Sequence, residues 1–332
     1  MILEVRAFSR LHFGLMEICP GQPYCYGGVG MMIDTPSMIV RGRLVRGGEI
    51  ALDGDAYWTE RTQLATNAWI KQTDAPKLPL ESIQVVLPPR PHVGLGSGTQ
   101  WACSVAGLLQ LAQAIDHLPS DASSIWRQLY PTAASLASHA GRGLRSHIGT
   151  EGFRCGGWIV DWGQPESEGR TQSIPFPKAW RVVTICDSAY QGESGPSEAR
   201  IFERCSTQPN SNRAEMVRLI QHEMVPSVLA ADWRTASQAI GRYGVLAGRI
   251  FEPLQGGVYR SPSIAACVAG LQGLGILGVG QSSWGPTVFA LAQDDEQAHW
   301  IAEQLRRRSV TDAEIRIAQA APPARYELSS SS

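Results

Sequence analysis

A glycine-rich segment followed directly by an apolar helical run is the feature that most constrains this chain. Residues 91–100 read Pro-His-Val-Gly-Leu-Gly-Ser-Gly-Thr-Gln, and apolar residues then recur at helical spacing over residues 100–115. At the start of a helix, the accessible backbone N–H groups of such a segment and the helix dipole both favour an anion. The segment therefore predicts a phosphate or pyrophosphate site, with a simple glycine-rich turn before a packed helix as the alternative.

The overall composition narrows the class of protein. The chain has 332 residues, enough for one large or two medium domains with a sizeable core. Its 29 Lys and Arg residues against 30 Asp and Glu leave a formal charge of -1, which gives no indication of a nucleic acid or an anionic membrane as partner. No apolar stretch is long enough to span a bilayer, and the first residues lack the layout of a signal peptide. The seven cysteines are scattered and form no C-x-x-C pair, which is typical of reduced thiols, so we expect a cytoplasmic protein.

Helical and strand patterns alternate along the chain and predict an α+β fold. In the first half we expect strands at 3–8, 30–33, 38–44, 83–87 and 158–162, and helices at 57–71, 100–115 and 131–140. In the second half we expect helices at 197–205, 211–224, 232–250, 263–272 and 295–307, and strands at 182–186, 275–280, 286–292 and 314–317. A polar turn at 164–169 indicates a boundary between two domains, 1–168 and 169–325, with a cleft between them.

Four segments in a fixed order carry a family resemblance. They are residues 7–14 (Ala-Phe-Ser-Arg-Leu-His-Phe-Gly), the glycine-rich segment, residues 141–157 and residues 278–289. In order and spacing they resemble the motifs of the GHMP kinase superfamily, over nearly the whole chain. Within it, residues 11–15, 26–30 and 145–149 are similar to the family of β-ribofuranosylaminobenzene 5′-phosphate synthases. The resemblance implies an N-terminal α/β domain that carries the phosphate loop and a ferredoxin-like C-terminal domain.

One departure from the kinase pattern favours the synthases. In many kinases of the superfamily the third motif reads Ser-Gly-Ile-Asp, and the Asp activates the acceptor hydroxyl. Aligning Ser146 with that Ser places Gly149 at the position of the Asp. Glycine cannot accept a proton, so the ordinary kinase reaction loses its base.

The resemblance to the synthases implies a decarboxylating pentosyl transfer. The substrates would be 5-phosphoribosyl 1-pyrophosphate and either 4-aminobenzoate or 4-hydroxybenzoate, with Mg²⁺ assisting. The products would be a β-ribofuranosyl arene 5′-phosphate, CO₂ and pyrophosphate, an early step of methanopterin biosynthesis, and the family resemblance also suggests a homodimer. Such chemistry depends more on stabilising the leaving group and orienting the substrates than on a general base.

The motifs then supply candidate site residues. The candidates for substrate and phosphate binding are Arg10, Gly94, Gly96, Ser97, Gly98, Thr99, Arg142, Ser283 and Gly285. The candidate catalytic residues are His12, Arg145, Ser146 and Glu151. Ser97 and Glu151 are also the candidate Mg²⁺ ligands, because hard cations prefer oxygen.

Simpler interpretations of these residues stay open. His12 is equally expected as a packed histidine on a strand, the arginines as a solvated loop, and Glu151 as a surface acid. Among the ten tryptophans, Trp101 and Trp284 adjoin the motifs and either stack on a benzoate ring or belong to the core. For the whole protein, the alternatives are an ATP-dependent small-molecule kinase of the same superfamily and a metabolite-binding module without turnover.

Overall fold

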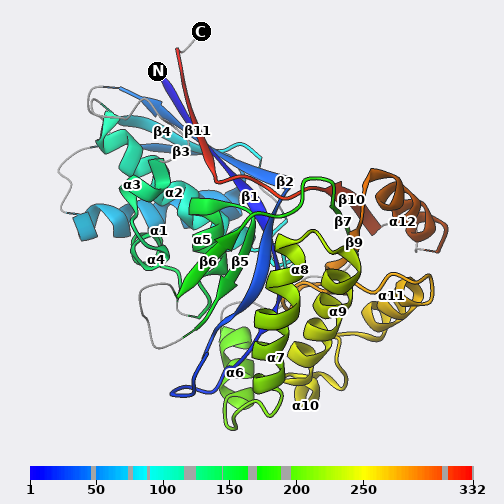
Figure 1. Cartoon of the computed structure of the whole chain (residues 1–332). Helices are drawn as coiled ribbons and strands as arrows, with labels where there is room; N and C mark the ends of the chain where they lie inside the picture. The colour runs from blue at the N-terminus through cyan, green and yellow to red at the C-terminus, as the bar shows by residue number, and fades with distance from the viewer. Residues whose placement is uncertain are drawn as a thin grey trace.

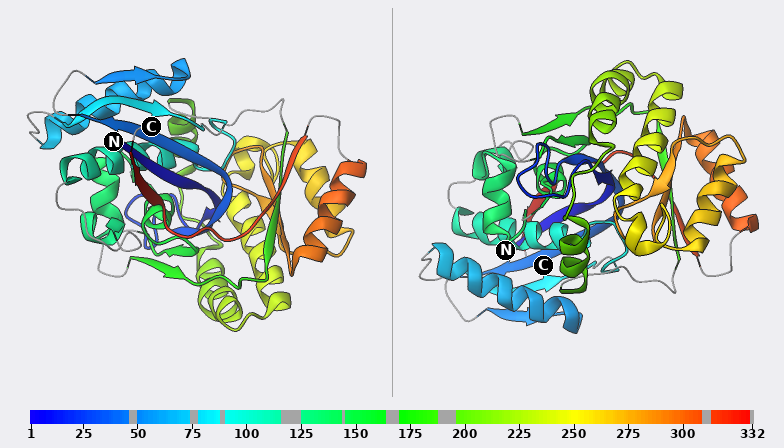
Figure 2. Two further views of the ribbon diagram at one scale, coloured as in Figure 1. Left: turned by 90° about the horizontal axis from the view of Figure 1, so that it is seen from above. Right: turned by 90° about the horizontal axis from the view of Figure 1, so that it is seen from below.

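Two β-sheets with helices packed on them organise the computed structural model (Figures 1 and 2). The structure describes residues 1–45, 50–73, 78–87, 90–115, 125–143, 145–163, 170–187, 196–308 and 313–330. In this part of the chain, no helix combines the length and the apolar composition needed to cross a membrane. No disulfide links the seven cysteines, all of which lie in described segments.

The larger sheet is built on a long antiparallel hairpin of β1 and β2. Its strand order is β11-β1-β2-β4-β3, and β5 pairs with β2 and with β6. Its strands are β1 (Ile2–Leu15), β2 (Gly28–Leu44), β3 (Ala51–Asp53), β4 (Leu80–Val85), β5 (Trp158–Asp161), β6 (Thr171–Ile174) and β11 (Arg325–Ser329). The strands expected at 30–33 and 38–44 are therefore one strand, β2, whose pairing with β1 shifts register between Phe8 and Ser9.

The helices of the first half lie against this sheet (Figure 1). They are α1 (Ala56–Thr73), α2 (Ser97–Gln113), α3 (Ile125–Leu129), α4 (Ala133–His139) and α5 (Ile148–Cys155). Helix α2 is almost entirely buried and contacts both β1 and β2, and the glycine-rich segment before it lies beside β1, where Arg10 N donates to Leu95 O (2.9 Å). The helix expected to open at Pro131 begins instead at Ala133, because the Thr132 side chain caps it by accepting from Ser135 N.

The smaller sheet has the ferredoxin-like topology that the family resemblance implied. Its strands are β7 (Arg181–Asp187), β8 (Val279–Gln281), β9 (Val288–Ala292) and β10 (Ala313–Ala318). The spatial order β10-β7-β9-β8 is antiparallel throughout. The helices of this half are α6 (Pro196–Cys205), α7 (Arg213–Leu219), a π-helix η2 (Ile220–Met224), α8 (Val225–Leu229), α9 (Trp233–Arg249), α10 (Glu252–Gln255), α11 (Pro262–Gln272) and α12 (Asp295–Arg308). With α11 before β8 and α12 between β9 and β10, the chain follows a βαββαβ order.

Side chains that point to opposite faces of the smaller sheet belong to two different hydrophobic cores. Val288 and Ala290 of β9 face α11 and α12, whereas Phe289 and Leu291 face α9 and the larger sheet. The sheet therefore stands between α9 on one side and α11 and α12 on the other (Figure 2). Because the second core also contains residues of β1 and β2, the two halves pack on one another directly.

The chain passes from the larger to the smaller sheet between β6 and β7, after the expected boundary. The polar turn at 164–169, and with it the boundary at 168, lies outside the described residues. Strand β6 after it still belongs to the larger sheet, and the chain returns to that sheet with β11. The division into 1–168 and 169–325 stays a prediction.

Candidate active site

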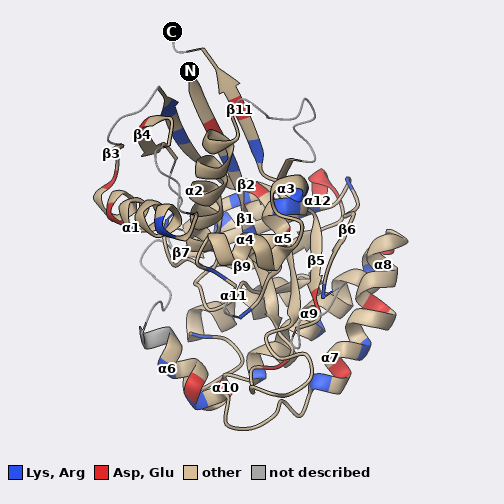
Figure 3. Cartoon of the chain, turned by 90° about the vertical axis from the view of Figure 1, so that its left-hand side faces the viewer, with Lys and Arg blue, Asp and Glu red and all other residues tan. Residues whose placement is uncertain are grey.

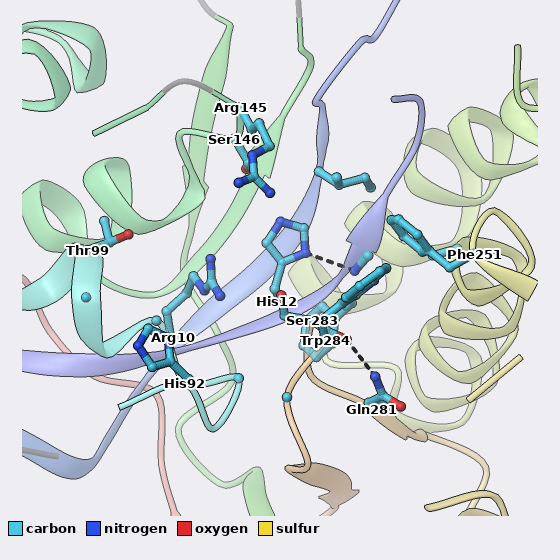
Figure 4. A pocket seen from close by; sticks show the side chains of 18 of the residues that line it. Arg10, His12, His92, Thr99, Arg145, Ser146, Phe251, Gln281, Ser283 and Trp284 are labelled. Carbon is cyan, nitrogen blue, oxygen red and sulfur yellow. Dashed lines mark hydrogen bonds between the residues drawn. The ribbon is translucent and has the colours of Figure 1, made fainter. Parts of the chain in front are cut away.

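A cavity of about 420 Å³ lies where the two halves meet (Figure 4). It is lined by β1, the start of α2, the segment before α5, the helices α6, α9 and α10, and the loop between β8 and β9. The first, second and fourth motifs thus meet at one site, together with the 141–146 part of the third. All predicted phosphate-binding residues line the cavity, and so do His12, Arg145 and Ser146.

The start of α2 forms an anion-binding end of this cavity. Gly96 caps the helix in the left-handed conformation (φ 69°) and has no side chain that could occupy the first N–H groups. Arg10 packs on this cap, since a Cβ on Gly96 would stand 3.1 Å from its Nε. Arg142 lies over the first turn in the same way, 3.4 Å from where a Cβ on Gly98 would be. Open backbone amides, the positive helix end and two guanidinium groups are what a phosphate or pyrophosphate requires.

The fourth motif holds the glycine-rich segment in place. Gly94 has a φ of 87°, and a Cβ there would stand 2.4 Å from the Ser282 carbonyl oxygen. Ser282 Oγ donates to Gly94 O (2.7 Å), and Thr287 Oγ1 donates to Val93 O (2.6 Å). The turn within residues 278–289 therefore packs directly against the glycine-rich segment.

His12 is both buried and part of the cavity wall. Its backbone N–H donates to Ser282 Oγ (3.1 Å), and its Nδ1 accepts from Gly14 N (3.1 Å). Burial, and then the neighbouring Arg10 guanidinium, lower the pKa of His12 well below its ordinary value of 6.5. The neutral ring with Nδ1 as acceptor carries its proton on Nε2. Figure 4 shows this second nitrogen directed toward Arg145 and Ser146, so His12 offers a neutral hydrogen-bond donor.

Ser146 is positioned by a buried acid of the larger sheet. Its Oγ donates to Asp161 Oδ2 (3.2 Å), which also accepts from His147 N (2.6 Å). Asp161 is fully buried and paired with Arg170 (2.9 Å). The acid thus fixes the segment that carries Arg145 and Ser146, and it does not reach the cavity itself.

Glu151 is the predicted residue that the structure does not bring to the site. It lies buried in α5, outside the cavity wall, and its carboxylate pairs with Arg154 and accepts from Cys155 Sγ (3.2 Å). Arg154 also donates to the carbonyl oxygens of Tyr130 and Pro131 (2.7 Å each). Contrary to the expectation from sequence, Glu151 stabilises α5 and is neither placed as a catalytic acid nor as a metal ligand.

Position 149 has no room for the missing kinase acid. A Cβ on Gly149 would stand 2.9 Å from Thr99 Cγ2, and the Gly149 carbonyl accepts from Gln100 Nε2 (2.9 Å). Helices α5 and α2 therefore meet through a glycine. Among the described residues that line the cavity there is no Asp or Glu, whereas four are arginines: Arg10, Arg61, Arg142 and Arg145.

Sequence reasoning missed several residues of the cavity wall. Arg61 lies on α1 with its guanidinium 4.7 Å from the Tyr57 ring centroid, and Tyr57 Oη is 2.8 Å from His92 Nε2. Phe202 and Phe251 come from helical segments of the second half. An arginine on an amphipathic helix and isolated phenylalanines carry no sequence signal that separates them from surface and core residues. Helices α6 and α7 carry both positive and negative side chains (Figure 3), whereas the described wall of the cavity carries arginines and no acid.

The oxygen donors of the cavity suit Mg²⁺ only when the ion is also bound by a polyanionic ligand. In the described segments, no group of three or more His, Cys, Asp or Glu side chains is placed to hold a metal ion. The oxygen donors near the helix start are the hydroxyl groups of Ser97 and Thr99. These residues fit a Mg²⁺ ion that arrives bound to pyrophosphate oxygens, and they do not form a carboxylate site of their own.

The fold and the glycine-loop cavity together define a protein of the GHMP kinase fold class. A model of the family GHMP kinases C terminal matches residues 224–310. Homoserine kinase from Cytophaga hutchinsonii has the same fold, with a TM-score of 0.70 and 14% identity over 98% of this chain and 97% of that one.

Over most of its length the chain is similar to proteins named beta-ribofuranosylphenol 5'-phosphate synthase. It is 28% identical to that of Archaeoglobus fulgidus over 322 residues, 92% of either chain. It is 25% identical to that of Methanothermobacter thermautotrophicus over 324 residues, 89% of this chain and 90% of the relative. These findings confirm the resemblance that the four motifs predicted. The relatives are named for a phenol, whereas the family predicted from the sequence is named for an aminobenzene. The two names differ in the 4-substituent of the ring.

Proposed function

We propose that this protein is a decarboxylating pentosyltransferase that joins 5-phosphoribosyl 1-pyrophosphate to a 4-substituted benzoate. The product is a β-ribofuranosyl arene 5′-phosphate, released with CO₂ and pyrophosphate in an early step of methanopterin biosynthesis. The relatives' name favours 4-hydroxybenzoate over 4-aminobenzoate as the second substrate.

One observation carries the proposal: the described wall of the cavity holds four arginines and no carboxylate. The sugar substrate carries several negative charges on its phosphates, and the benzoate adds another. Arginines at the start of α2 bind such groups through charge-assisted hydrogen bonds, whereas an acid in the wall would repel them. A kinase that activates an alcohol gains from a base at this point, and Gly149 leaves no space for one.

The reaction is balanced without a protein base. The bond between C1 of ribose and the pyrophosphate oxygen breaks, and its electron pair leaves with pyrophosphate. The ring carbon that bears the carboxylate forms a bond to C1. The bond to the carboxylate then breaks and returns its electron pair to the ring, so that CO₂ departs and aromaticity is restored. No proton has to be removed, which agrees with an acid-free wall.

The residues of the cavity have distinct tasks in this scheme. The amides at Ser97 and Gly98, with Arg10 and Arg142, bind the pyrophosphate and stabilise the charge that develops as it leaves. His12 donates a hydrogen bond without adding charge. Mg²⁺ bound to pyrophosphate, with Ser97 as a protein ligand, would supply further charge neutralisation on the leaving group.

The test is release of labelled CO₂ from carboxyl-labelled 4-hydroxybenzoate and 4-aminobenzoate. The protein is incubated with Mg²⁺ and 5-phosphoribosyl 1-pyrophosphate, and parallel reactions contain either ATP in place of the sugar or EDTA in place of Mg²⁺. We expect release only with the sugar and Mg²⁺ together. No release from either benzoate, with ATP consumed against a panel of metabolites, would overturn the proposal in favour of a kinase.

A further inference from the structure

The cavity changes character from one end to the other. Opposite the start of α2, three aromatic side chains form the wall: Phe202 of α6, Phe251 after α9, and Trp284 of the loop between β8 and β9. Each ring contacts the other two, with centroid distances of 4.8 Å (Phe251–Trp284), 5.6 Å (Phe202–Phe251) and 6.1 Å (Phe202–Trp284). Trp101, the other tryptophan near a motif, is buried in α2 against Trp58 and belongs to the core.

One of the guanidinium groups that line the cavity stands at the edge of this aromatic wall. The Arg145 guanidinium carbon lies 4.1 Å from the Phe202 ring centroid. Figure 4 shows Arg145 pointing toward His12, between Thr99 on one side and Phe251 and Trp284 on the other. An apolar face of aromatic rings beside one guanidinium group matches a small flat ligand with one carboxylate.

The direction of the reaction fits this division of the cavity. The sugar substrate carries its pyrophosphate in the α configuration, and the proposed product is the β anomer. Direct displacement at C1 with this inversion requires that the ring carbon attack from the face opposite pyrophosphate. Thr99 and the start of α2 lie across the cavity from Phe251 and Trp284 (Figure 4), which places the two groups on opposite sides of the ribose.

We propose that Phe202, Phe251 and Trp284 bind the ring of the benzoate and that Arg145 binds its carboxylate. This subsite rests on the proposed function. The rings hold the arene by stacking and by excluding water, and Arg145 orients the carboxylate so that the carbon bearing it faces C1. Arg145 therefore serves the arene, and Arg10 and Arg142 serve the phosphates.

The experiment measures both substrates separately in matched variants. Phe202→Ala removes a half-buried ring, and Glu203→Ala changes the adjacent, exposed residue of α6, which does not line the cavity. We expect Phe202→Ala to raise the KM for 4-hydroxybenzoate about 3- to 10-fold, without changing the affinity for the sugar substrate, and Glu203→Ala to leave both unchanged.

Arg145→Gln tests the carboxylate contact with two ligands of the same shape, whose dissociation constants are measured by calorimetry. We expect the wild type to bind the carboxylate-bearing 4-hydroxybenzoate more tightly than neutral 4-hydroxybenzamide. Arg145→Gln is expected to weaken the benzoate on the order of 10- to 100-fold and to leave the benzamide nearly unchanged. A purely structural role of Arg145 would weaken both equally.

The outcomes separate the subsite from the function. If the wild type releases CO₂ but Phe202→Ala keeps the wild-type KM and Arg145→Gln keeps the preference for the benzoate over the benzamide, the subsite is wrong and the function stands. If the wild type neither binds a benzoate in calorimetry nor releases CO₂, both fall.

Discussion

Ser282 joins three of the four motif segments, so its hydroxyl tests whether their contacts hold the cavity together. It accepts from His12 N (3.1 Å) and donates to Gly94 O (2.7 Å), and its side chain is fully buried. Ser282→Ala leaves one backbone donor and one backbone acceptor without these partners. At about 1–3 kcal/mol for each of the two buried groups left unpaired, the free energy of unfolding decreases by about 2–6 kcal/mol.

The same loss has a thermal and a kinetic consequence. With about 2.1 cal/mol/K of unfolding entropy per residue, the 332-residue chain loses about 3–9 °C in Tm. Because Gly94 then loses an anchor beside the start of α2, we also expect the KM for 5-phosphoribosyl 1-pyrophosphate to increase. Calorimetry and initial rates of CO₂ release measure the two effects. Ser211→Ala, at an exposed serine, is the control and should shift neither. A Tm within 1 °C of wild type and an unchanged KM would refute the reasoning.

Three further variants address single residues. Arg142→Ala removes a guanidinium group from the start of α2, so the KM for the sugar substrate should rise roughly 10- to 100-fold while Arg306→Ala on α12, the control, leaves it unchanged. Glu151→Gln breaks the buried pair with Arg154 and should lower stability by about 3–5 kcal/mol in urea unfolding, with kcat per folded molecule retained. His12→Asn should remove part of the pH dependence of stability. Because burial lowers the pKa of His12, this side chain is protonated below pH 6.5 in the unfolded chain and stays neutral in the folded protein. The free energy of unfolding of the wild type therefore decreases as the pH is lowered below 6.5, by up to about 1.4 kcal/mol per pH unit.

Each of these has an outcome that contradicts it. An Arg142→Ala protein with wild-type KM would remove this residue from the phosphate site. A hundredfold drop in kcat for folded Glu151→Gln would return Glu151 to the chemistry. For His12, unfolding is measured at pH 7.5, 6.5 and 5.5, and equal slopes in the variant and the wild type would show that the histidine is not kept neutral by the fold.

Much of this fold could be predicted because its signals are local. The start of α2 follows from glycines and small polar residues before an apolar run, and the helix begins at Ser97, three residues earlier than the periodicity indicates. Strand β9 and helix α12 lie close to their predicted ranges, whereas β8 (Val279–Gln281) contains only the last two residues of the strand expected at 275–280. The site was predicted mainly through the motifs, which bring ten or more residues of distant segments to one cavity.

What the sequence did not reveal depends on tertiary contacts. Helix α5 is rich in glycine, and no helix was predicted there. Those glycines allow α5 to pack closely on its neighbours, since a Cβ on Gly152 would stand 2.3 Å from Met32 Sδ. Strand β11 forms only because β1 offers an edge for it. Glu151 was expected at the site because it is an acid within the third motif. Its partner Arg154 lies one helical turn away and pairs with it in the core.

The most direct test of the proposed reaction is the ratio of its two small products. Carbon dioxide and pyrophosphate are measured together in one reaction with 4-hydroxybenzoate, the sugar pyrophosphate and Mg²⁺. The account predicts one CO₂ for each pyrophosphate, and neither product when one of the two substrates is left out. Pyrophosphate released without the benzoate, or phosphorylation of a metabolite by ATP in place of both products, would contradict it.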